Sequence, residues 1–321
     1  MIGKVDPETL AALVLGRTGA ADEAVLQGPA YGEDTAAIDL GEQVLVINSD
    51  PISLAVDRVG TLGVAVACND VAASGARPRW LTSVVFLPGD DETLLDRITA
   101  QLDEAAREQG VAIVGGHSEY APALSTPLLV LTCLGVTDRY VPSAGARPGD
   151  RIVLAGSAGI EATAILATDF RDRVADAVPA AVVDRAATFY NDVSVVAAGT
   201  ALAEHARAMH DPTEGGLVDG LLEMAVASGV RIAVDRDDVP VRDETARLCA
   251  AAGVDPLRTF GSGALVAAVP PDAVSAALAA LDDAGIEGTV VGRVVDGDPA
   301  LVLDEDVIET PVRDEMYPLW E

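Results

Sequence analysis

Acidic residues stand beside glycines or other small residues at four places along the chain, and this combination can do chemistry. The four stretches are YGEDTAAI at 31–38, INSDPIS at 47–53, ACNDVAASGARP at 67–78 and HDPTEGGL at 210–217. Carboxylates offer the hard oxygen ligands that Mg²⁺ takes, and bound Mg²⁺ also contacts phosphate oxygens. Neighbouring glycines let backbone N–H groups approach a phosphate. The pattern favours a site for a metal and phosphate groups.

Asp70 gives the sharpest of these signals because its surroundings are small and apolar. It lies in the run 59–78, which is typical of a buried helix that ends near Gly75 and Pro78. An unpaired buried carboxylate is costly, so Asp70 should have a partner. The other acidic residues also have ordinary interpretations, with Asp34 in a turn, Asp50 in a turn before a proline and Asp211 as a helix cap.

Two further stretches are rich in glycine, VGGHSEY at 114–120 and GSGAL at 261–265. His117 in the first is either a structural histidine or part of a site. The chain has no GxxxxGK[ST] motif, which excludes a P-loop enzyme. Lys4 is the only lysine, so most phosphate charge would have to be neutralised by metal, arginine or backbone. The scarcity of lysine therefore favours a site in which carboxylates bind Mg²⁺ and the Mg²⁺ neutralises the phosphates.

Composition indicates a globular protein with an extreme charge. The 321 residues suit two domains of about 150 residues each. The three cysteines suggest neither a disulfide framework nor a zinc site, and without a signal peptide or long apolar run we expect a soluble, cytoplasmic protein. The net charge of −30 disfavours nucleic acid and anionic membranes as partners. Salt screens such self-repulsion, so the charge predicts a halophilic protein from a very salty cytoplasm.

The elements that must position these residues read as an α+β protein. Helices are predicted at 6–27, 59–74, 91–110, 159–168, 178–187, 191–207, 216–228, 241–252 and 272–284. Strands are predicted at 36–40, 43–48, 80–87, 111–114, 128–136, 151–155, 232–234, 263–269 and 288–295. PSAGARPGD at 142–150 is rich in proline and glycine, which predicts domains at 1–145 and 146–321.

Taken in order, these stretches resemble the superfamily of aminoimidazole ribonucleotide (AIR) synthetase, HypE, selenophosphate synthetase and thiamine-monophosphate kinase. GEDTAAI resembles the family's Gly-Asp-Asp-Ala-Ala loop, and NDVAASGARP its Asn-Asp helix and Gly-Ala-x-Pro exit. VGGHSEY resembles its later glycine-rich loop, DPTEGGL the signature that opens a helix of the second domain, and GSGAL its Ser-Gly turn. The resemblance spans residues of about 30 to 265.

The resemblance implies a two-domain PurM-like architecture, with an amino-terminal sheet that forms a homodimer and a carboxy-terminal α+β layer. ATP would lie between the domains, with Mg²⁺ on the acidic loops. The implied metal ligands are Asp34, Asp50, Asp70 and Asp211, and the implied catalytic residues are Asp70, Asp211 and His117. The implied nucleotide contacts are Gly32, Asn69, Gly115, Gly116, Thr213, Gly215 and Gly216.

Departures from the family narrow the expected chemistry. The chain ends MYPLWE, without the cysteine that receives the carbamoyl group in HypE, and residues 1–40 lack the cysteine of selenophosphate synthetases. His117 stands where HypE and the kinase usually have aspartate. This weakens the metal site expected there and leaves His117 either to contact substrate or to support a residue that does. We expect a HypE-like or AIR-synthase-related enzyme that hydrolyses ATP to activate an oxygen of a small-molecule or protein-terminal acceptor. The alternatives are a thiamine-phosphate-kinase-like small-molecule kinase and a non-catalytic nucleotide-binding regulator.

Overall fold

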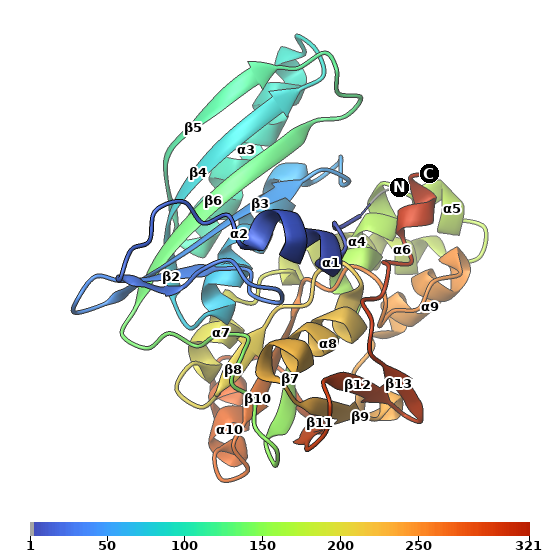
Figure 1. Ribbon diagram of the computed structural model, residues 1–321. Helices are drawn as coiled ribbons and strands as arrows, with labels where there is room; N and C mark the ends of the chain where they lie inside the picture. The colour runs from blue at the N-terminus through green and yellow to red at the C-terminus, as the bar shows by residue number, and fades with distance from the viewer. Residues whose placement is uncertain (1–2) are drawn as a thin grey trace.

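The structure is a computed structural model that describes residues 3–321, and its elements form two α+β units that meet along helix α2 (Val59–Ala73; Figure 1). The first unit contains a six-stranded sheet in the order β1-β2-β3-β6-β4-β5. Its strands are β1 (Val25–Gln27), β2 (Ala36–Asp39), β3 (Val44–Ile52), β4 (Arg77–Leu87), β5 (Ala112–Tyr120) and β6 (Leu128–Thr137). Only β4 and β5 pair in parallel.

The second unit contains a seven-stranded sheet in the order β13-β12-β9-β11-β7-β10-β8. Its strands are β7 (Arg151–Gly156), β8 (Ala208–His210), β9 (Arg231–Val234), β10 (Ala264–Val269), β11 (Gly288–Val295), β12 (Ala300–Leu303) and β13 (Asp306–Ile308). All pairs are antiparallel except β12 with β9. Strand β8 is an edge strand, and its end delivers the next residue, Asp211, to the junction of the two units.

Helices cover the two sheets. In the first unit, α3 (Glu92–Gln109) is amphipathic and packs beside α2, with Ile98 and Leu102 in the core. The helices of the second unit are α4 (Ile160–Thr168), α5 (Arg171–Val174), α6 (Ala180–Ala186), α7 (Val196–Leu202), α8 (Gly216–Ser228), α9 (Asp243–Ala252) and α10 (Val274–Asp283). Short helical turns lie at η2 (Ala187–Asp192), η3 (Arg236–Asp238) and η4 (Tyr317–Leu319). No helix of the described chain is long and apolar enough to span a bilayer.

Helix α2 is buried on all sides, as its run of small apolar residues predicts. Val64, Cys68 and Val71 pack against the first sheet, whereas Leu62 and Val66 pack with the helices of the second unit. This position between the units explains why a polar group on α2 can face residues from both.

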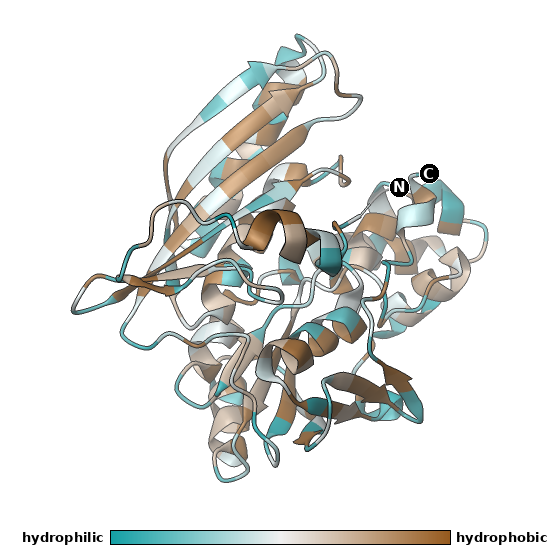
Figure 2. Ribbon diagram, viewed as in Figure 1, coloured by the Kyte–Doolittle hydropathy of each residue, from teal (hydrophilic) through white to brown (hydrophobic). Residues whose placement is uncertain are grey.

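The predicted α+β fold class is confirmed. The predicted helix at 6–27 is wrong after Leu15, because it consists of α1 (Pro7–Leu10) and the π-helical turn η1 (Ala11–Leu15), followed by irregular chain and β1. Gly19 takes the left-handed φ of +71°, which ordinary helix excludes. Leu13 and Val14 in this turn are about half exposed. The brown colour of this part of the ribbon in Figure 2 marks it as hydrophobic.

Other elements differ in length from the predictions. Helix α7 occupies only Val196–Leu202 of the predicted 191–207, because the chain before it forms η2 and an irregular turn. Strand β5 runs through Tyr120, so the stretch VGGHSEY is extended strand and not a loop. The short strands β8, β12 and β13 were not predicted.

Candidate active site

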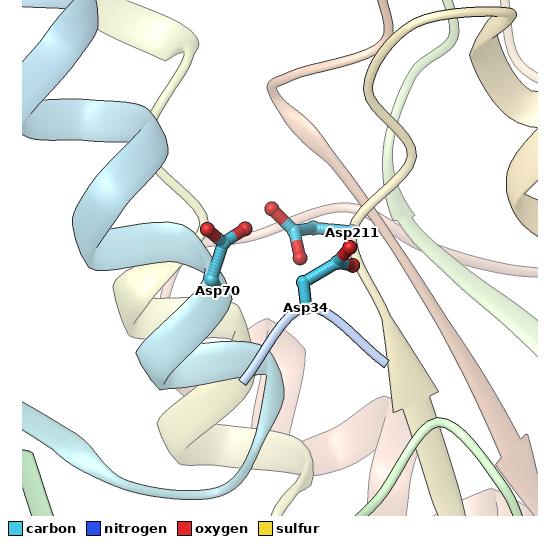
Figure 3. A group of neighbouring side chains, drawn as sticks. All are labelled: Asp34, Asp70 and Asp211. Carbon is cyan, nitrogen blue, oxygen red and sulfur yellow. The ribbon is translucent and has the colours of Figure 1, made fainter. Parts of the chain in front are cut away.

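Three aspartates from three separate elements converge where the two units meet (Figure 3). Asp34 comes from the loop before β2, Asp70 from α2 and Asp211 from the turn after β8. Each offers a carboxylate oxygen, and these oxygens lie within 4.8 Å of one another. Three hard oxygen donors at this spacing match the preference of Mg²⁺.

Asp70 has a direct partner in Asn48 on β3. The Asn48 amide donates from Nδ2 to Asp70 Oδ2 at 2.5 Å, and Asn48 Oδ1 accepts the N–H of Cys133 at 3.2 Å. Asn48 is therefore fixed by the neighbouring strand β6 and holds one oxygen of Asp70 in place.

The three aspartates repel one another. Burial, followed by repulsion from Asp34, raises the pKa of Asp211 to about 7. Burial and repulsion from Asp211 hold the pKa of Asp70 well above its usual range. Asp34 keeps 37% of its side chain exposed, yet desolvation of its carboxyl raises its pKa to about 6. Such a set gains stability from a cation that neutralises it.

A buried histidine and the only lysine balance part of this charge. His210 Nε2 lies 3.0 Å from Glu223 Oε2, and His210 Nδ1 lies 3.5 Å from Asp34 Oδ2. Burial alone would lower the pKa of His210, but Glu223 and Asp34 outweigh it and raise that pKa to about 9. Lys4 Nζ lies 3.4 Å from Glu223 Oε1 and 3.7 Å from Glu214 Oε2.

The charge of Glu223 is maintained by the same two cations. Burial would raise its pKa, but Lys4 and His210 together lower that pKa to about 2. A charged chain thus runs from Lys4 through Glu223 and His210 to Asp34, and it ties the amino-terminal segment to the cluster.

Two adjoining cavities open beside the aspartates. The smaller, of about 120 Å³, lies between the units and includes Asp34, Asp50 and Asp70 in its lining. The larger, of about 480 Å³, lies beneath the amino-terminal segment. Lys4, Asp34 and Glu214 line both cavities. A ligand that fills both would therefore pass directly over the carboxylates.

Asp50 and Thr213 lie in the smaller cavity and Gly32 in the larger one. Asp50 is outside the group of three, although its charge acts on Asp70. Gly32 has a φ of +77°, and a Cβ there would stand 3.0 Å from the carbonyl oxygen of Glu223. Its small size allows the Asp34 loop to pack on α8.

Gly215 and Gly216 have a structural role that the sequence did not indicate. Their φ angles are +80° and +65°, and a Cβ on Gly216 would lie 2.4 Å from the Thr259 carbonyl oxygen. The Gly215 N–H donates to Asp314 Oδ2 and the Gly216 N–H to the Thr213 carbonyl. Both N–H groups therefore have partners within the chain, and the contacts of Gly215 and Gly216 with a nucleotide stay a prediction.

Asn69, which is predicted as a nucleotide contact, forms two hydrogen bonds within the chain. Its Nδ2 donates to the Val193 carbonyl at 2.8 Å, and its Oδ1 accepts the Val195 N–H at 2.7 Å. Asn69 is fully buried, and these bonds join α2 to the second unit.

His117, Gly115 and Gly116 do not join the aspartates within this chain. All three lie on β5, the edge strand of the first sheet, and neither cavity includes them. The His117 side chain is 63% exposed, and its Nε2 lies 3.4 Å from Glu119 Oε2. The catalytic role of His117 and the nucleotide contacts of the two glycines stay predictions.

Sequence reasoning missed Asn48, His210 and Glu223 as site residues. His210 directly precedes Asp211, and Glu223 lies four residues after Asp219 on α8, so the acidic signature at 210–217 was the nearest available signal. Asn48 stands two residues before Asp50 on the same strand, and this spacing places both side chains on one face of the sheet, which was the available signal.

Comparison with known proteins assigns both halves of the chain to one family. Residues 32–137 match the family described as AIR synthase related protein, N-terminal domain. Residues 147–304 match the corresponding C-terminal domain.

Curated relatives include two kinds of enzyme. The carbamoyl dehydratase HypE of Rhizobium leguminosarum bv. viciae is 32% identical over 83% of this chain and 78% of its own. The thiamine-monophosphate kinase of Halobacterium salinarum is 34% identical over 78% of this chain and 81% of its own.

Solved structures show the same fold. A HypE in complex with ATP is 25% identical and matches with a TM-score of 0.70 over 96% of this chain and 95% of its own. AaThiL complexed with AMPPCP and TMP is 20% identical, with a TM-score of 0.78 over 97% of each chain. The resemblance predicted from the motifs is thereby confirmed, and the chain belongs to the AIR synthase related protein family.

Proposed function

We propose that this chain is a Mg²⁺-dependent enzyme that binds and hydrolyses ATP and phosphorylates an oxygen atom of its substrate. The observation that carries the proposal is the convergence of Asp34, Asp70 and Asp211, whose oxygens lie within 4.8 Å of one another at the junction of the two units. In-line phosphoryl transfer needs positioning and charge neutralisation more than covalent work by the protein.

Family membership makes the chain an ATP-using enzyme. Its relatives are named as a dehydratase and a kinase, and one structural neighbour was solved with ATP. Phosphorylation of an oxygen is the step that both reaction types can share. The Halobacterium relative favours a small-molecule kinase as the specific form of this activity.

The residues present fit a divalent cation. Asp211 Oδ2 is buried and has no hydrogen-bond partner within the described chain. The mutual repulsion that raises the pKa values of Asp34 and Asp211 is the repulsion that a cation relieves. When bound, Mg²⁺ supplies positive charge for the phosphate oxygens. Asp34, Asp70 and Asp211 would hold it, with Asp50 nearby.

We place the nucleoside in the larger cavity. Its volume of about 480 Å³ and its partly apolar lining, which includes Val5, Leu10 and Tyr317, suit a base and ribose. Tyr31 Oη is buried without a hydrogen-bond partner in residues 3–321 and can bond to the ligand. The phosphates would then extend past Lys4 toward the aspartates. Lys4 lines both cavities, and its ion pairs with Glu214 and Glu223 fix its position.

We also propose that the protein is a homodimer that pairs through its first sheet. Along β6, Leu129, Leu131 and Cys133 are buried against α2, whereas alternate residues such as Val130 remain partly exposed on the opposite face. Every residue of β5 is exposed as well. Light scattering in concentrated KCl should give twice the mass of one chain, and Val130→Asp should give a monomer. A wild-type monomer would contradict the proposal.

The function is tested by ³¹P NMR of ATP with Mg²⁺ and the protein in concentrated KCl. We expect ADP and phosphate to form and Asp70→Asn to abolish their formation. Asp103→Asn, which changes an exposed aspartate of α3, is the matched control and should keep full activity.

Three other results of this NMR experiment would contradict the proposed function, each in a different way. Bound ATP without turnover, whatever acceptor is added, would identify a nucleotide-binding regulator. Formation of AMP would indicate selenophosphate-synthetase-like chemistry. ATP signals that the protein does not affect would leave only the fold in common with the family.

A further inference from the structure

The lining of the smaller cavity also includes residues of the second unit. Glu161 and Ser262 are two polar residues among them, and both line the cavity together with Asp70. Glu161 is 5% exposed and Ser262 is fully buried. Neither residue is needed to hold the metal or the nucleoside in the arrangement described above.

Local backbone structure fixes this pair. Gly159 caps α4 in the left-handed conformation, and Glu161 lies in the first turn of that helix. The Glu161 N–H donates to the Ser262 carbonyl at 3.2 Å, and the Ser262 N–H donates to Glu161 Oε2 at 3.3 Å. These reciprocal bonds hold the carboxylate against the turn at 261–263 and so fix its position in the cavity wall.

The pair has unused hydrogen-bonding capacity. Ser262 Oγ is buried and has no hydrogen-bond partner within the described chain. No basic side chain in residues 3–321 forms an ion pair with Glu161. A buried hydroxyl without a partner is uncommon in a folded protein, and beside a cavity it points to a ligand.

We propose that Glu161 and Ser262 bind the acceptor hydroxyl and that Glu161 accepts its proton as the γ-phosphoryl group is transferred. This inference rests on the proposed function and deepens it by assigning the acceptor side of the same cavity. The acceptor would thus lie in the smaller cavity, whose lining includes both Glu161 and Asp70.

The step balances without a further reactant. The acceptor oxygen forms a bond to the γ-phosphorus, and the bond from that phosphorus to the β,γ-bridging oxygen breaks. The bonding electron pair leaves with ADP. The hydroxyl proton passes to the Glu161 carboxylate, and Ser262 Oγ orients the acceptor by a hydrogen bond.

The charge of the cavity defines the class of acceptor. Lys4, the basic residue of its lining, is already paired with Glu214 and Glu223. The acidic residues of the lining are Asp34, Asp50, Asp70, Glu161 and Glu214. An anionic acceptor would meet net repulsion here. The remaining lining is apolar and includes Ile52, Leu54, Leu62, Ile165 and Phe260. The acceptor is therefore a neutral or cationic alcohol with an apolar part.

The ionisation of Glu161 suits this role. Burial raises the pKa of Glu161 to about 7, although hydrogen bonding from the adjacent Ser262 lowers this pKa in part. The carboxylates of Glu214 and Asp314 contribute to the increase. A general base is most effective when its pKa lies near the working pH.

The test uses the full-length protein with Mg²⁺, ATP and three two-carbon alcohols that differ in charge: ethylene glycol, ethanolamine and glycolate. ³¹P NMR distinguishes the phosphate ester from inorganic phosphate, and calorimetry gives the affinity for Mg²⁺–ADP. For wild type we expect esters of ethylene glycol and ethanolamine and much less ester of glycolate. Glu161→Gln should lower ester and phosphate formation by about 100-fold, as for loss of a general base, and leave the ADP affinity unchanged.

Thr163→Val is the matched control because Thr163 is a buried polar residue on the same helix that bonds to Gly159 and Thr245 instead of facing the cavity. It should retain wild-type turnover. Equal rates for wild type and Glu161→Gln would overturn the assignment while the proposed function stands, and so would equal ester yields from glycolate and ethylene glycol. A wild type that does not bind Mg²⁺–ADP would refute the proposed function itself, and this inference with it.

Discussion

Asn48 Nδ2 donates a hydrogen bond of 2.5 Å to Asp70 Oδ2, and this contact joins the central strand β3 to the buried helix α2. It provides within the chain the partner that a carboxylate in such apolar surroundings requires. Asp70 also offers a carboxylate oxygen to the group that it forms with Asp34 and Asp211 (Figure 3). Asn48 thus fixes the orientation of a carboxylate that belongs to the candidate metal site.

Replacing Asn48 by alanine should weaken both stability and metal binding. Asp70 would lose its hydrogen-bond partner inside the core, and a buried polar group left without a partner costs about 1–3 kcal/mol in the free energy of unfolding. Urea denaturation measures this cost, and calorimetry with Mg²⁺–ADP should show about tenfold weaker binding because Asp70 is no longer held in place. Ser49→Ala is the control on the same strand and changes an exposed side chain. Equal stability of wild type and Asn48→Ala would show that the contact is dispensable.

Without metal, the stability of the protein should decrease as the pH rises from about 4 to about 7. Folding raises the pKa of Asp34 to about 6 and that of Asp211 to about 7, from an ordinary value of 3.8. Over this interval the folded state binds more protons than the unfolded state, so its advantage falls with pH. Mg²⁺ should restore stability most strongly above pH 7, where Asp34 and Asp211 are charged.

Denaturation in EDTA and in Mg²⁺ at a series of pH values measures this effect. Asp211→Asn removes one titrating group and should flatten the curve recorded in EDTA. The same pH dependence in wild type and in the variant would contradict the assignment of the repulsion to this cluster.

His210 should stabilise the fold through its charge up to about pH 9. Its pKa rises from 6.5 to about 9 in the folded state, so its contribution is fully present below 6.5 and is lost as the pH rises through 9. His210→Gln keeps a donor for Glu223 but cannot be charged, and it should cost up to about 3 kcal/mol at pH 6 without metal. Above pH 9 the two proteins should converge.

His117→Gln is the matched control for this experiment. His117 is 63% exposed on β5, and its replacement should leave stability unchanged over the same pH range. A large loss of ATP turnover in His117→Gln would instead support the role that the sequence predicted for this residue.

The sequence predicted the three aspartates but not the residues that support them. Asp34, Asp70 and Asp211 stand in local motifs that can be recognised residue by residue. Asn48, Lys4 and Glu161 acquire their roles only through tertiary contacts, such as the pairing of Lys4 with Glu223 across 219 residues. Contacts between residues so far apart leave no pattern in the local sequence, so sequence patterns could not predict the roles of these three residues.

The secondary structure could likewise be predicted where the local sequence pattern is strong and not where it is weak. The long helices α2, α3 and α8 were predicted closely because their patterns are strong and their ends are marked by glycine. The segment after Leu15 was wrongly predicted as helix because apolar spacing was given more weight than Gly16 and Gly19. Strands β8, β12 and β13 are three or four residues long, too short for a periodic pattern to appear.

We expect the melting temperature to rise steeply with KCl. The net charge of −30 strains the folded state by self-repulsion. The screening length falls from about 10 Å at 0.1 M salt to about 3 Å at 1 M, so most of the gain should occur within this range. Sucrose at matched osmolality is the control, because it favours compaction without screening charge. Maximal stability in dilute buffer would contradict the predicted halophilic character.

Asn69→Ala distinguishes a structural role from a nucleotide contact. Asn69 fastens α2 to the second unit through Val193 and Val195, at 2.8 and 2.7 Å. Its loss leaves two buried backbone groups unpaired, at about 1–3 kcal/mol each in the free energy of unfolding. Asn191→Ala, in the exposed turn just before Val193, is the control and should be neutral. Because the side chain does not reach the cavities, the Mg²⁺–ADP affinity of folded Asn69→Ala should match wild type. A variant of normal stability with strongly weakened nucleotide binding would reverse this interpretation and restore the contact that the motif predicted.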